Sequence, residues 1–214
     1  HLEVVDILSG VESKLNNNDY IELSRLIKSK GLLKKQPGYY VCRTLLTLGM
    51  MIASVALIVT VDTLWIQLVN AAFLAFVFTH IGFIAHDGGH QQIVTSARKI
   101  DFILLSVNFL IALNRSWWVE QHQNRHHSNP NDPDIDPDAN VPLLALTPEQ
   151  ALGKEGVSRF LVKHQAYLFF PMLCLKGISL RLAGIQHLLL KKAKYPLVES
   201  TVLIAHVVIY TGLL

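Results

Sequence analysis

Two uncharged windows, separated by one aspartate, place the strongest constraint on how this chain can fold. Residues 44–61 are 18 consecutive positions without a charged side chain, residues 63–85 are a further 23, and Asp62 lies between them. At about 1.5 Å per residue, the shorter window would make a helix of about 27 Å, close to the hydrocarbon thickness of a bilayer. The sequence therefore predicts two transmembrane helices joined by a tight turn.

The distribution of lysine and arginine predicts how this helical pair is oriented. Basic residues lie before and after the pair but not in its turn; they are Lys34, Lys35, Arg43, Arg98 and Lys99. Cytosolic flanks of membrane helices carry an excess of Lys and Arg. Both long flanks of the pair are therefore expected on the cytosolic side.

The other apolar segments are shorter or more basic. Residues 102–113 offer only 12 positions, which indicates an interfacial or re-entrant helix, and residues 178–189 indicate a basic helix lying on the membrane. Residues 200–214 begin a third span that is expected to continue beyond the sequence given. The predicted fold class is an all-α integral membrane helical bundle with interfacial helices and a cytosolic cap.

The N-terminal part differs from the rest in composition. Residues 1–40 are polar and mixed in charge, and their apolar residues at helical spacing predict a cytosolic amphipathic helix that ends near Gly31. Residues 41–214 are then expected to form the membrane domain.

Composition excludes several other classes of protein. Only 16% of the residues are charged, against about 25% in soluble domains, so neither a soluble domain nor a disordered chain is expected. The net charge of +3 is too small to indicate nucleic-acid binding. Cys42 and Cys174 lie in or beside apolar segments, so neither a disulfide scaffold nor a cysteine zinc site is expected.

Five of the ten histidines fall into two tight groups. His86 and His90 follow the second window, and a second group comprises His122, His126 and His127. Spacing of four residues puts two imidazoles on one helical face, and imidazole suits iron, copper, zinc or nickel. Because residues 102–113 are too short to cross, both groups are expected on one side of the membrane, which predicts a shared metal centre. Packing or interfacial roles are expected for four isolated histidines, which are His80, His164, His187 and His206.

These residues resemble the integral-membrane fatty acid desaturases, and most of all the bacterial acyl desaturases related to the front-end type. The resemblance covers most of the chain, and its two histidine motifs occur in the family's order. It rests on residues 22–25, 31–33, 37–40, 86–90, 117–118, 122–127, 129–135 and 165–171.

The resemblance implies a non-haem centre of two iron ions that uses dioxygen and two electrons to remove hydrogens from adjacent methylenes of an acyl chain. The family's first two histidine boxes match His86, His90, His122, His126 and His127, which are the implied ligands. Asp87 and Asp134 are expected to accept the second N–H of ligand imidazoles. For Asp134, an exposed loop position is an equal alternative.

Trp117 and Trp118 precede the second box. One interpretation makes them part of the lining of the acyl channel. The other, which the sequence favours, makes them aromatic anchors at the membrane interface.

Two features of the family's pattern are missing from these 214 residues. The family carries a third box with a further His-His pair after two more spans, and no second pair occurs here. The sequence is therefore expected to stop before that box. No haem motif of the fused electron-donor domain precedes the helical pair, so the electrons are expected from a separate ferredoxin or flavoprotein. The acyl group could be carried by coenzyme A, a carrier protein or a lipid.

Two alternatives stay open from the sequence. A hydroxylase, ketolase or epoxidase of the same membrane superfamily would use the same boxes, because one oxidant can insert oxygen or remove a second hydrogen. A non-catalytic membrane metal-binding protein would explain the missing third box.

Overall fold

The computed structural model describes residues 17–213, and every regular element in that range is a helix. The chain divides into two compact units, and the boundary between them in the sequence lies between Pro37 and Gly38. The predicted all-α helical fold is therefore confirmed for the described residues. Each unit is considered by itself.

The described part of the first unit contains helix α2 (Asn17–Ser29). The helix ends in a Schellman motif: Gly31 has a φ of +67°, its N–H donates to the carbonyl of Lys28, and Leu32 N–H donates to the carbonyl of Ile27. Such a left-handed C-terminal position favours glycine, which has no Cβ to clash. The helix predicted to end near Gly31 is thus present.

The second unit begins with two long apolar helices, α3 (Pro37–Thr60) and α4 (Leu64–Gly89), which contain most of the two uncharged windows. Each has a mean hydropathy of 2.0 and is long enough to cross a membrane. A buried polar pair joins them: Ser54 Oγ donates to Asn70 Oδ1 at 2.7 Å, and Asn70 Nδ2 donates to the Ser54 carbonyl at 3.0 Å. Most of both helices is exposed apolar surface, as expected for lipid contact.

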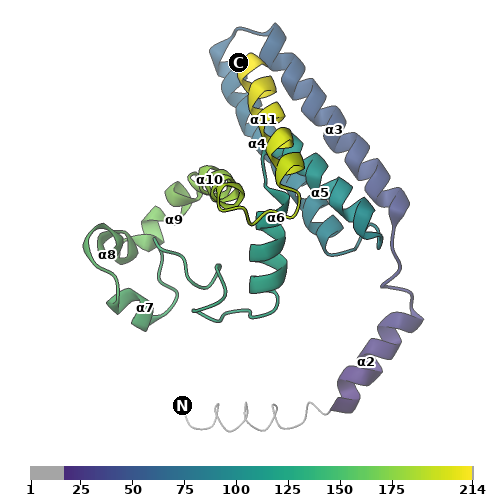
Figure 1. Cartoon of the computed structure of the whole chain (residues 1–214), viewed down its shortest axis with the longest axis vertical. Coiled ribbons are helices and arrows are strands. Elements are labelled where there is room, and N and C mark those ends of the chain that lie inside the picture. Colours follow the sequence, from purple (N-terminus) through teal and green to yellow (C-terminus); the bar gives the residue numbers. More distant parts are fainter. Residues whose placement is uncertain (1–16, 214) are drawn as a thin grey trace. The chain divides into compact units, whose positions relative to one another are not determined.

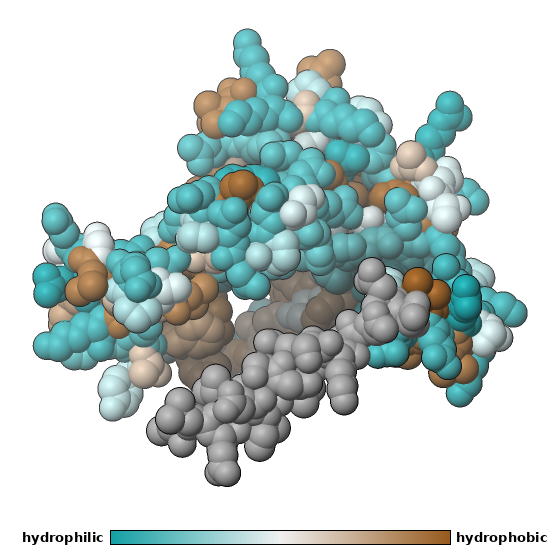
Figure 2. Space-filling model, turned by 90° about the horizontal axis from the view of Figure 1, so that it is seen from below, coloured by the Kyte–Doolittle hydropathy of each residue, from teal (hydrophilic) through white to brown (hydrophobic). Residues whose placement is uncertain are grey.

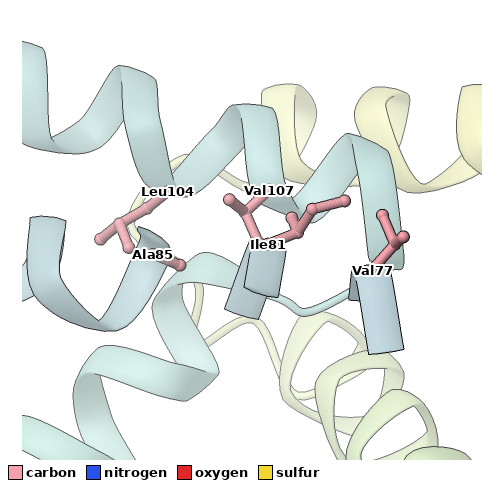
Figure 3. Packing of buried hydrophobic residues seen from close by; sticks show 5 residues of the cluster. All are labelled: Val77, Ile81, Ala85, Leu104 and Val107. Atoms are coloured by element: carbon pink, nitrogen blue, oxygen red, sulfur yellow. The ribbon is translucent and has the colours of Figure 1, made fainter. Parts of the chain in front are cut away.

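Helix α5 (Ala97–Ile111) packs along α4 and forms the apolar core of this unit. Val77, Ile81 and Ala85 of α4 are four residues apart and meet Leu104 and Val107 of α5 (Figure 3). At Ala112, with a φ of +56°, the chain leaves α5. It then bends by 115° into the short helix α6 (Arg115–Trp118) and the π-helix η1 (Val119–His126).

The predicted interfacial or re-entrant segment therefore corresponds to α5 and its sharp bend. Fifteen residues give about 22 Å of helix, which is short of a full crossing.

A proline-rich loop and five further helices complete the unit. They are α7 (Pro148–Leu152), α8 (Gly156–Lys163), α9 (Gln165–Leu173), α10 (Lys176–Leu189) and α11 (Pro196–Leu213). Helices α9 and α10 are bent by 63° relative to each other. Helix α11 packs against α5 (Figure 1), its Tyr210 ring lies 6.1 Å from that of Phe78 in α4, and it contains the apolar residues expected to begin a third span. By length and composition, the described residues offer two crossings, or four if each bent pair counts as one.

Hydrophilic side chains cover most of the surface that is visible in Figure 2, and several apolar patches lie among them. Helices α3 and α4, by contrast, expose mainly apolar side chains.

Candidate metal centre

The first histidine pair lies at the C-terminal end of α4. His86 is in the last turn, His90 ends the helix, and the His90 N–H donates to the His86 carbonyl at 3.0 Å. The intervening Gly89 is required by packing, because a Cβ there would lie 2.4 Å from Trp118. Glycine at this position lets the indole of Trp118 approach the helix end directly.

The second group lies on η1, and its backbone pattern changes which histidines meet. The His127 N–H donates to the carbonyl of His122, five residues earlier, as in a π-helix. His127 Nε2 consequently lies 3.2 Å from His122 Nε2. The ring of His126 stacks on His122 at 5.6 Å, but its Nδ1 faces a carboxylate instead. The spacing of four residues predicted that His122 pairs with His126, because that prediction assumes an ordinary α-helix.

The two groups converge although they are more than thirty residues apart. His90 Nε2 lies 3.3 Å from His122 Nε2. One nitrogen from each of His86, His90 and His122 falls within 4.8 Å of the others. The ring of His127 is 4.6 Å from that of His90. The structure therefore brings all five predicted histidines into one cluster.

The spacing of the nitrogens fits a transition-metal ion. Two imidazole nitrogens that each lie about 2.1 Å from a metal, at an angle of about 100°, are about 3.2 Å apart. That value agrees with the separations from His122 Nε2 to His90 and to His127. His122 Nε2 cannot donate a hydrogen bond to both neighbours, whereas one cation would satisfy all three lone pairs.

The electrostatic environment keeps this cluster ready to bind a cation. Burial, the largest cause, and the neighbouring rings of His127, His86, His90 and His126 together lower the pKa of His122 to about 4. Burial likewise lowers the pKa of His90, with His86 and His127 adding to the effect. Both imidazoles are therefore neutral at pH 7 and have lone pairs available.

Asp87 contacts the first pair from the opposite side. His86 Nδ1 lies 3.3 Å from Asp87 Oδ1, while Oδ2 accepts hydrogen bonds from Tyr40 Oη at 3.1 Å and from Arg43 Nη1 at 3.2 Å. A carboxylate at Nδ1 leaves Nε2 of His86 free to face the cluster. Sequence reasoning missed Tyr40 and Arg43; their three-residue spacing at the start of α3 is the only signal of a shared polar face.

His126 is held by Asp136, an aspartate that the sequence did not single out. Both Asp136 oxygens lie 3.0 Å from His126 Nδ1, and the side chain is only 2% exposed. Burial alone would raise its pKa, but hydrogen bonds from the backbone N–H groups of Asn131 and Asp138, together with the contact to His126, outweigh burial and lower the pKa to about 2.

Asp134, the residue expected in this role, is exposed, and its N–H donates to Asp132 within the loop. The alternating Asp-Pro pattern does not reveal which aspartate turns inward.

The two tryptophans occupy different positions. Trp118 stacks on His122 with 4.9 Å between ring centres and also faces His86 and His90 edge-on. Trp117 is half-buried, and its backbone N–H donates to Asn114 Oδ1 at 2.8 Å at the start of α6. Only Trp118 therefore belongs to the wall of the histidine cluster.

Similarity to known proteins shows the family to which these histidine boxes belong. The family model described as "Fatty acid desaturase" matches residues 63–214, which is most of the chain. The chain belongs to the fatty acid desaturase family. The resemblance found in its sequence is thereby confirmed, as is membrane localisation in general terms.

The family's curated relatives are considerably longer than this chain. It is 29% identical over 179 residues to Delta(8)-fatty-acid desaturase 2 of Arabidopsis thaliana, covering 77% of this chain and 39% of the relative. It is 27% identical over 190 residues to the Acyl-lipid (9-3)-desaturase of Borago officinalis, covering 82% of this chain and 42% of the relative. It is 34% identical over 140 residues to the Delta 8-(E)-sphingolipid desaturase of Candida albicans, covering 56% of this chain and 24% of the relative. The chain thus spans about two fifths of the plant relatives' length. No solved structure matches it.

In this family member, a buried glutamate ties α11 to the helix that carries the second box. Glu199 is fully buried and accepts hydrogen bonds from Asn114 Nδ2 at 2.9 Å, from Ser116 N–H at 3.1 Å and from Tyr195 N–H at 3.3 Å. The Ser116 hydroxyl donates to Glu199 Oε1, the oxygen that also accepts from the Tyr195 N–H. No lysine or arginine pairs with this carboxylate among the described residues, so hydrogen bonds alone compensate its burial.

A second network fixes the other end of the same bend. Asp101 of α5 accepts hydrogen bonds from Arg115 Nε at 3.0 Å, from Tyr195 Oη at 2.7 Å and from Lys194 Nζ at 3.2 Å. Together with Glu199, it joins α5, α6 and α11 at the point where the chain turns toward the histidines. Sequence analysis identified none of these anchors, because each contact spans a distant part of the chain.

The isolated histidines lie apart from the cluster. His80 and His164 pack against Phe76 and Phe160, and His206 Nδ1 bonds the carbonyl of Phe109 at 2.6 Å. His187 is buried in α10, and no hydrogen-bond partner for its Nε2 is found among the described residues.

Proposed function

We propose that the protein desaturates a fatty acyl or lipid chain with dioxygen, at a centre of iron ions held by the clustered histidines. The observation that carries the proposal is the meeting of Nε2 atoms from both boxes, in a chain that belongs to the fatty acid desaturase family. The relatives' printed names, which include fatty-acid, acyl-lipid and sphingolipid desaturases, support a lipid chain as substrate.

The proposed iron ligands are the five histidines of the two boxes. They are His86, His90, His122, His126 and His127. Asp87 orients His86, and Asp136, in place of Asp134, orients His126. A two-ion centre needs more ligands than five histidines, and we assign the remainder to a third histidine box outside these 214 residues.

Iron at this centre would supply the activation of dioxygen. The overall reaction is balanced when one CH2–CH2 unit, one dioxygen, two electrons and two protons give one CH=CH unit and two water molecules. The electrons would come from a separate donor of the ferredoxin or flavoprotein type.

The chain's own residues supply positioning and exclusion of water. Trp118 covers the His122 ring and closes against Gly89. Because an indole at this point leaves little room for solvent, we assign Trp118 to shielding the centre and to the wall that the acyl chain passes. Trp117 is retained as a substrate-lining candidate at the start of α6. The boxes are assigned to the cytosolic face, as the basic flanks of the α3–α4 pair indicate.

The test is a combined measurement of iron and product on the full-length protein. We expect purified protein to bind iron, and lipid extracts from expressing cells to contain acyl chains that have lost two hydrogens. His122→Ala should abolish both, whereas His164→Ala, outside the cluster, should preserve both. Products that gain oxygen would favour the hydroxylase alternative. Iron binding without any product, after a competent donor is supplied, would favour a non-catalytic metal-binding protein.

A further inference from the structure

Asp87 divides its two carboxylate oxygens between its own helix and helix α3. Oδ1 lies 3.3 Å from His86 Nδ1, whereas Oδ2 accepts hydrogen bonds from Tyr40 Oη at 3.1 Å and from Arg43 Nη1 at 3.2 Å. His86 and Asp87 are neighbours on α4, while Tyr40 and Arg43 lie in the first two turns of α3. One carboxylate thus links a proposed iron ligand to an arginine 44 residues earlier in the sequence.

Helical spacing does not by itself bring Asp87 against the His86 ring. Adjacent residues on an α-helix point about 100° apart, so their side chains do not face each other. The carboxylate can turn toward water unless its second oxygen is held. The two donors of α3 hold that oxygen, which leaves Oδ1 directed at His86 Nδ1. The contact between His86 and Asp87 therefore depends on α3.

The Arg43 guanidinium is itself held in place. It lies over the Tyr39 ring, 6.0 Å from the ring centre, and the Tyr39 ring meets that of Tyr40 edge-on at 5.1 Å. The side chains of Arg43 and Asp87 are 19% and 23% exposed, so their ion pair is largely shielded from water. Shielding strengthens the attraction between opposite charges. The start of α3 therefore presents an ordered charge to Asp87.

The second histidine box is supported in a different way. Asp136 contacts His126 and is fixed by the backbone N–H groups of Asn131 and Asp138 in its own loop. That support is local in the sequence, whereas the support of Asp87 comes from another helix. A change at the start of α3 would thus act on the first box and leave the contact between Asp136 and His126 intact.

We propose that Arg43 and Tyr40 are positioning residues of the iron centre and act on His86 through Asp87. By holding Oδ2, they keep Oδ1 as the acceptor of the hydrogen on His86 Nδ1, so that Nε2 retains its lone pair for a metal ion. The inference rests on the proposed function in one respect, because it takes His86 as an iron ligand.

The tautomer of His86 tests this action without any metal. In metal-free, full-length protein in nanodiscs, nitrogen chemical shifts of 15N-labelled histidines report which ring nitrogen carries the hydrogen, and a His86→Gln spectrum identifies the His86 signals. The hydrogen is expected on Nδ1 in wild type. We expect Arg43→Gln, and to a smaller degree Tyr40→Phe, to populate the other tautomer. An identical tautomer distribution in wild type and Arg43→Gln would overturn the proposal.

Iron affinity tests whether this positioning matters for the metal. Fe(II) binding in competition with a chelator should be weakened about three- to tenfold by Arg43→Gln. Arg43→Lys should recover part of the loss, because it restores the charge with a single donor group. In the Asp87→Asn background, Arg43→Gln should cause no further loss, since the residue through which it acts is already changed. Additive losses would contradict an action through Asp87.

Two variants control for charge and for helix packing. Arg98→Gln removes the same charge from the exposed start of α5 and should leave iron affinity unchanged. Ser54→Ala breaks the buried hydrogen bond to Asn70 that joins α3 to α4 farther along the pair, and it should lower stability without changing the His86 tautomer. A Ser54→Ala variant that shifted the tautomer as strongly as Arg43→Gln would show that helix packing in general positions His86, and would contradict the proposal.

The two readouts separate this inference from the proposed function. A tautomer shift in Arg43→Gln, with a wild-type protein that binds no iron, would sustain the positioning role and reject the iron centre. Iron-dependent desaturation by wild type, with the tautomer and the iron affinity unchanged in Arg43→Gln, would do the reverse.

Discussion

Asp136 holds His126 with both carboxylate oxygens, each 3.0 Å from Nδ1, and is itself fixed by two backbone N–H groups of its own loop. This contact fixes the ring's orientation and gives Nδ1 its hydrogen, so that Nε2 stays free. The loop that follows the second box thereby acts on the geometry of the cluster.

Replacing this aspartate should weaken metal binding. We expect Asp136→Asn to reduce iron affinity by about tenfold or more, because the amide is a poorer acceptor and leaves His126 less well oriented. Iron per chain, measured by mass spectrometry after dialysis against a graded chelator, gives the comparison. Asp134→Asn is the control and should behave as wild type. If Asp134→Asn alone reduced the affinity, the assignment of these two aspartates would have to be reversed.

Gly89 should not tolerate a side chain. In Gly89→Ala the added Cβ would lie 2.4 Å from the Trp118 ring, and we expect a loss of about 1–3 kcal/mol in stability together with a disturbed cluster. Thermal unfolding in detergent and iron content would both report the change. Gly49→Ala, where no atom lies within 4 Å, should cost nothing. Trp118→Leu in the Gly89→Ala background should restore part of the stability, and a lack of restoration would mean that another contact sets the requirement for glycine.

The buried glutamate of α11 should be needed as a carboxylate. Glu199→Gln replaces one accepting oxygen by an NH2 group that must face existing donors, so we expect a loss of about 1–3 kcal/mol. Chemical unfolding monitored by tryptophan fluorescence would measure the loss. The exposed Glu155→Gln serves as the control. A stability equal to that of wild type would show that α11 is held to α6 by other contacts.

Acid should destabilise the bend through Asp101. Burial alone would raise the pKa of Asp101, but hydrogen bonds from Tyr195, Arg115 and Lys194 outweigh burial and hold the pKa below 3.8. A carboxyl group whose pKa is lower in the folded protein than in the unfolded chain stabilises the fold fully at pH values above the unfolded-state pKa. This contribution is lost as the pH falls through the folded-state pKa. The midpoint of thermal unfolding of wild type should therefore exceed that of Asp101→Asn by a constant amount from pH 6 to about pH 4.

Below pH 4 the two midpoints should converge. Asp62→Asn, at an exposed turn position, should match wild type throughout. A difference between Asp101→Asn and wild type that stayed the same down to pH 3 would show that ionisation of Asp101 does not stabilise the fold.

Local sequence rules were sufficient for the long apolar helices, for the end of α2 and for the family. The uncharged windows predicted α3 and α4 because a hydrocarbon layer demands an unbroken apolar helix of fixed length, whatever it packs against. Gly31 marked the end of α2 because its left-handed backbone is a local requirement. The two histidine groups named the candidate ligands because their spacing is itself local.

The tertiary structure decided which groups meet. Whether His122 pairs with His126 or with His127 depends on the π-helical turn, which residue spacing does not encode. The choice of Asp136 over Asp134 depends on how a proline-rich loop folds back on η1. Glu199 and Asp101 gain their roles from contacts with distant helices. Sequence by itself thus determined what must be helix and which side chains can bind a metal. Burial and long-range hydrogen bonds, which exist only once the helices pack, decided how those side chains are held.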